Sequence, residues 1–185
     1  RVRVDKPESS FAAGQELASM LDPRGLVHAF VLADGLGVNG SELVKGLNSR
    51  LPLGVTVTGG LAGDGARFKE TFVVWDGALE SGVVGIVGFY GASLKVGYGS
   101  LGGWDPFGPE RLVTRSKGNV LYELDGKSAL SLYRSYLGGH ANDLPASGLL
   151  YPLTLRVEEG RPGVVRTILA IDEKESSMTF AGDVP

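Results

Sequence analysis

The spacing of apolar positions predicts both helices and strands in this chain. Apolar side chains at residues 10–21, 41–51 and 127–137 are spaced to form one face of a helix. An uninterrupted apolar run at residues 25–33 predicts a strand buried on both faces. The β-branched residues 55–58 predict the next strand. The order strand, helix, strand in this first part predicts a βαβ unit with a parallel pair of strands.

After the βαβ unit the apolar segments become short and are joined by Gly- or Asp-containing turns. This pattern is typical of an antiparallel meander, so we expect a mixed α/β (α+β) fold in which helices flank a mixed sheet. The meander strands are expected at residues 68–75, 82–89, 94–98, 111–114, 151–157, 164–171 and 177–180.

Small and polar residues at 138–148 predict a linker after the third helix. We therefore expect one domain at residues 1–139, a linker at 140–150 and the start of a second domain at 151–185. The last strands have no following helix to cover them, and a sheet with one uncovered face is only marginally stable. This leads us to expect that the sequence is a piece of a longer protein.

Composition excludes several classes of function. The chain has no cysteine, which excludes thiol catalysis and thiolate metal sites and is consistent with a cytoplasmic location. Its net charge is −3 and it has no basic cluster, so we expect no nucleic-acid partner. No apolar run is long enough to span a membrane, and the first residues lack the apolar region of a signal peptide.

Glycine is unusually frequent, at 29 of 185 residues, and is dense in the sequence GVTVTGGLAGDG at residues 54–65. A strand that ends in such a loop indicates either a small-ligand site or a difficult turn. Asp34 and Asp64 follow two strands whose parallel pairing would place them at the same edge, where open α/β sheets bind ligands. Trp104 would add an apolar wall, or simply pack on the core. The predicted ligand-binding residues are Asp34, Gly35, Gly59, Gly60, Gly63, Asp64 and Trp104.

Other motifs are less informative. Residues 35–40 match G-x-G-x-x-G, but Asp34 places a negative charge where a pyrophosphate would lie, which argues against a dinucleotide site. We find no nucleophile, base and orienting residue that would make an active site, so we expect a binding protein and not an enzyme. His28 is interpreted as a hydrogen-bonded core residue. His140 would ligate a metal or haem only if the protein held one, and we expect no cofactor.

Three motifs resemble those of the FIST family. They are ADGL at residues 33–36, GGLAGD at 59–64, and the segment from Val113 that ends in GNVLYELDG at 118–126. Residues 1–139 look like the later part of the N-terminal FIST region, and residues 151–185 look like the opening strands of the C-terminal one. The resemblance implies a sensory module that binds an amino acid or related metabolite. It also implies a signalling partner such as a kinase or a cyclic-nucleotide enzyme.

Three alternatives stay open beside this sensor interpretation. Some similar bacterial members are haem-binding sensors of nitric oxide, which here would need His140 or His28 as an axial ligand. An enzyme acting on a small metabolite would need a titrating residue such as Asp64. A pure protein-interaction module would present an exposed apolar patch in place of a pocket.

Overall fold

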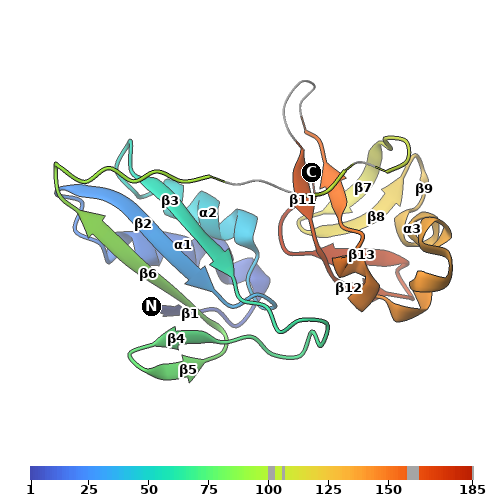
Figure 1. Cartoon of the computed structure of the whole chain (residues 1–185), viewed down its shortest axis with the longest axis horizontal. Coiled ribbons are helices and arrows are strands. Elements are labelled where there is room, and N and C mark those ends of the chain that lie inside the picture. Colours follow the sequence, from blue (N-terminus) through green and yellow to red (C-terminus); the bar gives the residue numbers. More distant parts are fainter. Residues whose placement is uncertain (100–102, 106, 158–162, 185) are drawn as a thin grey trace. The chain divides into compact units, whose positions relative to one another are not determined.

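The computed structural model describes residues 1–99, 103–105, 107–157 and 163–184, and its elements form two compact units (Figure 1). Unit 1 comprises Arg1–Gly65 and Lys69–Ser100, and unit 2 comprises Ala66–Phe68 and Leu101–Pro185. The mixture of helices and mixed sheets confirms the predicted fold class. Among the described residues, no helix combines the length and apolar character needed to cross a bilayer.

Unit 1 is built on a four-stranded sheet in the order β1-β6-β2-β3. Strands β2 (Leu26–Ala33) and β3 (Thr56–Leu61) are parallel, and helix α2 (Gly40–Asn48) connects them, which confirms the predicted βαβ unit. Strand β6 (Val83–Tyr90) lies antiparallel to β2 and to the short β1 (Val2–Arg3).

Two helices cover one face of this sheet (Figure 1). A 3-10 helix, η1 (Pro7–Ser9), leads into α1 (Ser10–Ser19), which packs against α2. The two helices approach closely because Gly14 and Gly46 lie where they meet. A Cβ atom on Gly14 would lie only 2.3 Å from a backbone oxygen of α2. The core beneath them includes Leu17, Leu47, Ala29, Val31, Val84 and Ile86.

The other face of the sheet is open, which corrects the prediction that residues 25–33 are buried on both faces. Phe30 is 38% exposed and Leu32 is 44% exposed, and the outward side chains of β6 are similarly accessible. Among the described residues of unit 1, no helix lies on this outer face. A small hairpin, β4 (Val73–Trp75) and β5 (Ala78–Glu80), contacts β6 and turns at Asp76-Gly77, in agreement with the expected Gly- or Asp-containing turns.

Unit 2 contains a second sheet in the order β12-β13-β8-β7, with β9 (Lys127–Ser128) also paired to β8. Helix α3 (Ala129–Leu137) packs on β8 and β13, and the Ser128 hydroxyl caps it by accepting from the Ser131 N–H at 3.1 Å. The strands are β7 (Val113–Lys117), β8 (Val120–Leu124), β12 (Ile168–Asp172) and β13 (Ser177–Phe180). The shared core includes Leu121, Leu130, Tyr133, Ile168, Met178 and Phe180.

The remaining elements of unit 2 include the segment for which the sequence predicts a linker. The segment after α3 forms two 3-10 helices, η2 (Gly138–Asp143) and η3 (Ala146–Leu149), and part of η3 is buried. Strands β10 (Leu153–Leu155) and β11 (Val164–Arg166) form a separate antiparallel hairpin. The segment therefore packs as part of unit 2, because small residues allow tight helical turns as well as flexible chain.

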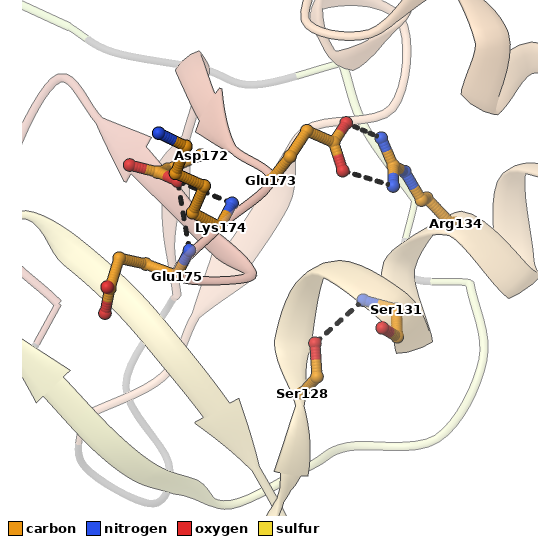
Figure 2. Close-up of polar contacts among 7 residues, drawn as sticks. All are labelled: Ser128, Ser131, Arg134, Asp172, Glu173, Lys174 and Glu175. Carbon is orange, nitrogen blue, oxygen red and sulfur yellow. Dashed lines mark hydrogen bonds and ion pairs between the residues drawn. The ribbon is translucent and has the colours of Figure 1, made fainter.

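Polar contacts join α3 to the turn between β12 and β13 (Figure 2). The Asp172 carboxylate accepts the N–H groups of Lys174 at 2.8 Å and Glu175 at 3.0 Å, which fixes the turn. Glu173 points the other way and forms a two-pronged ion pair with the Arg134 guanidinium on α3. Both side chains are solvent-accessible, so this pair adds only modestly to stability.

Several strand predictions need correction. The expected strand at residues 164–171 is divided into β11 and β12, which belong to different sheets, and β8 lies outside the expected strands. Residues 94–98 form no strand, and only the end of the predicted strand at 68–75 becomes β4. Strand β3 continues through Gly59 and Gly60, for which the sequence predicts a loop, because hydrogen bonding to β2 offsets the low strand propensity of glycine.

Candidate functional site

The parallel strands β2 and β3 bring the predicted aspartate and glycine residues to one edge of the sheet. Ala33 pairs with Leu61 in register, and the Ala62 N–H donates to the Ala33 carbonyl at 2.8 Å. Asp34 follows immediately after β2, and Asp64 lies three residues beyond the end of β3. The expected meeting of the two strand ends is therefore confirmed.

The Asp34 carboxylate is buried and accepts four hydrogen bonds from its own chain. One oxygen, Oδ1, accepts the N–H groups of Leu36 at 3.0 Å and Gly37 at 2.6 Å. The other, Oδ2, accepts the Thr71 hydroxyl at 2.7 Å and the Gly82 N–H at 3.3 Å. Thr71 and Gly82 stand just before and just after the β4–β5 hairpin, so Asp34 holds both ends of that hairpin.

These contacts determine the charge of Asp34. Burial alone would raise its pKa, but the four hydrogen bonds together outweigh burial and hold the pKa below its usual value. Asp34 is therefore ionised at neutral pH. Because its carboxylate occupies the N–H groups of Leu36 and Gly37, the G-x-G-x-x-G segment does not present them to a phosphate, in agreement with the sequence argument.

Asp64 plays a similar part on the neighbouring loop. It is buried, and its Oδ2 accepts the N–H groups of Lys69 at 2.8 Å and Glu70 at 3.3 Å. Asp64 thus holds the two residues just before Thr71, while Asp34 holds Thr71 itself and Gly82 after the hairpin. Direct contact between either carboxylate and a ligand stays a prediction, whereas their contacts to the hairpin segment are defined by the structure.

The four predicted site glycines fall into two groups. A Cβ on Gly35 would lie 1.8 Å from a carbonyl oxygen of the loop after β3, and one on Gly59 would lie 1.9 Å from the Val31 carbonyl. At Gly35 and Gly59, therefore, any side chain would collide with the neighbouring backbone, so only glycine fits. A Cβ on Gly60 or Gly63 would meet no atom within 4 Å, so packing within the chain does not explain those glycines.

A hollow of about 350 Å³ lies on the open outer face of unit 1, and sequence reasoning missed it. Phe30 and Leu32 of β2 and Gly85 and Val87 of β6 line it from the sheet, while β4 and Asp76 line it from the hairpin. Phe30 pairs with Val87 and Leu32 with Gly85, so these residues share one face. The sequence signal for this hollow is the set of apolar residues at alternate positions of β2 and β6, which share the face opposite to the two helices.

The two histidines occupy different environments. His28 is buried, and its ring nitrogens are hydrogen-bonded to Thr56 Oγ1 at 2.7 Å and Thr58 Oγ1 at 2.8 Å, as its interpretation as a hydrogen-bonded buried residue requires. It lies on the same face of β2 as Phe30, however, and not in the core beneath the helices. Haem ligation by His28 would require breaking one of these bonds. His140 is exposed in η2, with its ring centroid 5.5 Å from that of Tyr151. Among the described residues, no three His, Asp or Glu side chains are grouped to hold a metal ion.

Trp104 belongs to unit 2, whereas the other predicted ligand-binding residues belong to unit 1. Its side chain is half exposed, and the nearby Phe107 is almost fully exposed. This segment is therefore not packed on a core, contrary to one of the two sequence interpretations. Participation of Trp104 in a ligand site stays a prediction.

Comparison with known proteins gives matches to two family models. Residues 1–127 match the FIST N domain and residues 129–185 match the FIST C domain, so together the models cover nearly the whole chain. No curated protein and no solved structure matches the chain.

Proposed function

Because the chain belongs to the FIST family of signal-transduction sensor domains, we propose that it binds a small molecule and reports its presence to a partner protein. The proposed ligand is an amino acid or a related metabolite. The proposed partner is a signalling protein such as a kinase or a cyclic-nucleotide enzyme. We propose no reaction for this chain.

The observation that supports a ligand-binding role is the hollow on the outer face of unit 1. Its volume of about 350 Å³ lies at the lower end of the range that small-molecule sites occupy. Its lining is mainly apolar, with aromatic side chains from Phe30 and Trp75 and a single carboxylate from Asp76. A mostly apolar hollow with few polar groups is the usual composition of a small-molecule site.

The hairpin that walls this hollow offers a route for signalling. Asp34 and Asp64 do not line the hollow, but their hydrogen bonds hold the segment that carries the hairpin. A ligand shifts a protein between two states only when it binds one of them better. We propose that ligand contact with the hairpin changes the position of this segment, and that the partner senses the change.

A thermal-shift screen tests the binding step. The panel contains amino acids, amines derived from them, nucleotides and haem. A ligand at a hundredfold excess over its Kd adds ~2.7 kcal/mol to the stability of the folded state. We expect one amino-acid or amine class to raise the melting temperature. A response to haem alone that His140→Ala abolishes would support the haem alternative and contradict this proposal.

A matched pair of variants locates the binding site. Val87→Trp adds an indole ring inside the hollow at a position that is 50% exposed, and we expect it to abolish the shift. Val44→Trp makes the same change on α2, on the helical side of the sheet, at a position that is 45% exposed. We expect it to leave the shift unchanged. Equal effects of the two variants would place the ligand elsewhere.

Hydrogen exchange tests the signalling step. We expect ligand to increase protection of residues 59–65 and of the hairpin, relative to the ligand-free protein. Protection confined to the sheet, with no change in residues 59–65, would contradict the proposed route even if the ligand binds.

A further inference from the structure

We infer that the outer hollow of unit 1 selects a small organic cation with an apolar body, and that the Asp76 carboxylate pairs with its ammonium group. The inference rests on the proposed function and specifies the ligand chemistry at the same site. It follows from the charge of the lining, the position of Asp76 and the aromatic side chains beside it.

The charge of the lining is one-sided. Among the described residues that line the hollow, Asp76 is the only ionisable one, and the others are apolar side chains and Gly85. A ligand carboxylate would therefore find no positive side chain in this lining, whereas an ammonium would find a negative one. Electrostatic complementarity of this kind selects ligands by the sign of their charge.

Asp76 is placed to receive such a group. It forms the tip of the β4–β5 hairpin, its backbone has φ +49°, and its side chain is exposed. No hydrogen bond or ion pair of its carboxylate is found within the part of the chain that the structure describes. In this it differs from Asp34 and Asp64, whose oxygens accept hydrogen bonds from the backbone. The Asp76 carboxylate is available to a ligand without the loss of a contact that holds the fold.

Aromatic surfaces complete the site. A Cβ on Gly85 would lie 2.6 Å from atoms of the Trp75 ring, so the indole lies directly against the sheet where that side chain is missing. Phe30 lines the same hollow from β2. Faces of Trp and Phe rings bind the apolar part of a ligand and attract a nearby cation.

The ligand class that fits is an arylalkylamine or a similar amine, in preference to the corresponding amino acid. Both would offer an ammonium to Asp76 and an apolar body to the rings. The amino acid would also bring a carboxylate close to Asp76, where the lining provides no charge to balance it. We therefore expect affinity to decrease in the order amine, zwitterionic amino acid, carboxylate.

Three probes with one phenyl body test this order: 2-phenylethylamine, phenylalanine and 3-phenylpropionate. Binding is measured by calorimetry on the chain with both of its tryptophans, Trp75 and Trp104, in place. We expect the amine to bind about tenfold more tightly than the carboxylate. We also expect amine binding to weaken as salt is raised, since exposed charges are screened.

Two variants with a matched control test the role of Asp76. Asp76→Asn keeps the shape of the side chain and suits the positive φ, and we expect it to weaken amine binding about three- to fivefold, as for loss of an exposed ion pair. Glu16→Gln removes the same charge from α1 on the other side of the sheet and should change nothing. Val87→Lys places a cation in the hollow and should reverse the preference between amine and carboxylate.

Each outcome decides a different point. Equal affinity for the three probes, or an equal effect of Asp76→Asn and Glu16→Gln, would overturn the cation inference while the proposed sensor function stands. Absence of binding by all three probes at 10 millimolar, on the order of the weakest affinities that matter for a metabolite, would also overturn it. A thermal shift by another ligand of the panel would then still support the proposed function.

Discussion

Replacing Asp34 by Asn is expected to destabilise unit 1 strongly, because one carboxylate holds two parts of the fold. In the native protein Oδ1 accepts two loop N–H groups, and Oδ2 accepts Thr71 and Gly82 beside the hairpin. An amide keeps only one acceptor oxygen. If that oxygen stays on the loop, the amide NH₂ faces the Gly82 N–H, which can only donate, and the Thr71 hydroxyl, which would have to rotate its hydrogen away and accept a second bond beside the Gly35 N–H.

The expected cost follows from these contacts. Hydrogen bonds to a charged acceptor contribute about 1.5–3 kcal/mol each. Two such bonds are lost and two become neutral, while partial rearrangement of the exposed hairpin recovers some of the loss. We therefore expect Asp34→Asn to lower the free energy of unfolding of unit 1 by ~2–4 kcal/mol. The same change at Asp76, whose carboxylate has no contact in the described structure, should cost less than ~0.5 kcal/mol.

The assay is urea unfolding followed by Trp75 emission in the Trp104→Phe background, so that unit 1 is observed by itself. Its pH dependence gives a second test. Since the pKa of Asp34 is lowered in the folded state, its stabilisation is complete above the unfolded-state pKa of about 4 and is lost as pH falls through the folded-state pKa. The difference between wild type and variant should therefore shrink below pH ~4. A cost below ~1 kcal/mol, or a difference independent of pH, would refute this account.

Three further predictions concern glycine spacing, a buried tyrosine and a surface ion pair. Gly35→Ala should lower the free energy of unfolding of unit 1 by ~2 kcal/mol or more, because the added Cβ would collide with backbone atoms. Gly60→Ala, whose Cβ would meet no atom, should change this free energy by no more than ~0.5 kcal/mol. Equal values for the two variants in urea unfolding would contradict the steric argument. Burial, with a smaller contribution from Tyr151, raises the pKa of Tyr133 to about 12, so absorbance at alkaline pH should show one late-titrating tyrosine. Unit 2 should lose stability as pH rises from the unfolded-state value of about 10 towards 12, and Tyr133→Phe should remove this loss. Arg134→Ala should cost less than ~1 kcal/mol in thermal unfolding, and a larger cost would show that the exposed pair with Glu173 contributes more than its exposure implies.

Local sequence signals predicted much of unit 1. Asn39 is the N-cap of α2, since its side chain accepts the N–H groups of Ser41 at 3.0 Å and Glu42 at 3.2 Å, and an Asn just before an apolar helical pattern is a local signal for this role. The Asp76-Gly77 turn and the parallel β2–β3 pair were also predictable. Each depends on neighbouring residues or on the order of elements, which a single sequence records.

Features that depend on distant parts of the chain were not predictable in the same way. The sequence indicated that Asp34 and Asp64 reach one sheet edge, but not that donors such as Thr71 would satisfy the Asp34 carboxylate. The hollow was not predictable because a strand with apolar residues such as Phe30 has the same sequence pattern whether a helix or solvent covers that face. Only the side on which the chain places α1 and α2 decides which face stays open.

The sheet of unit 2 joins strands from both matched family regions. Leu121 of β8 lies in the region that matches the FIST N domain, and it pairs with Met178 of β13 in the region that matches the FIST C domain. The boundary between the two regions, at residue 128, thus passes through one hydrophobic core. Recombination between relatives at that point would separate side chains that pack against one another in this core. We therefore expect the two regions to be transferred between proteins together, as one unit.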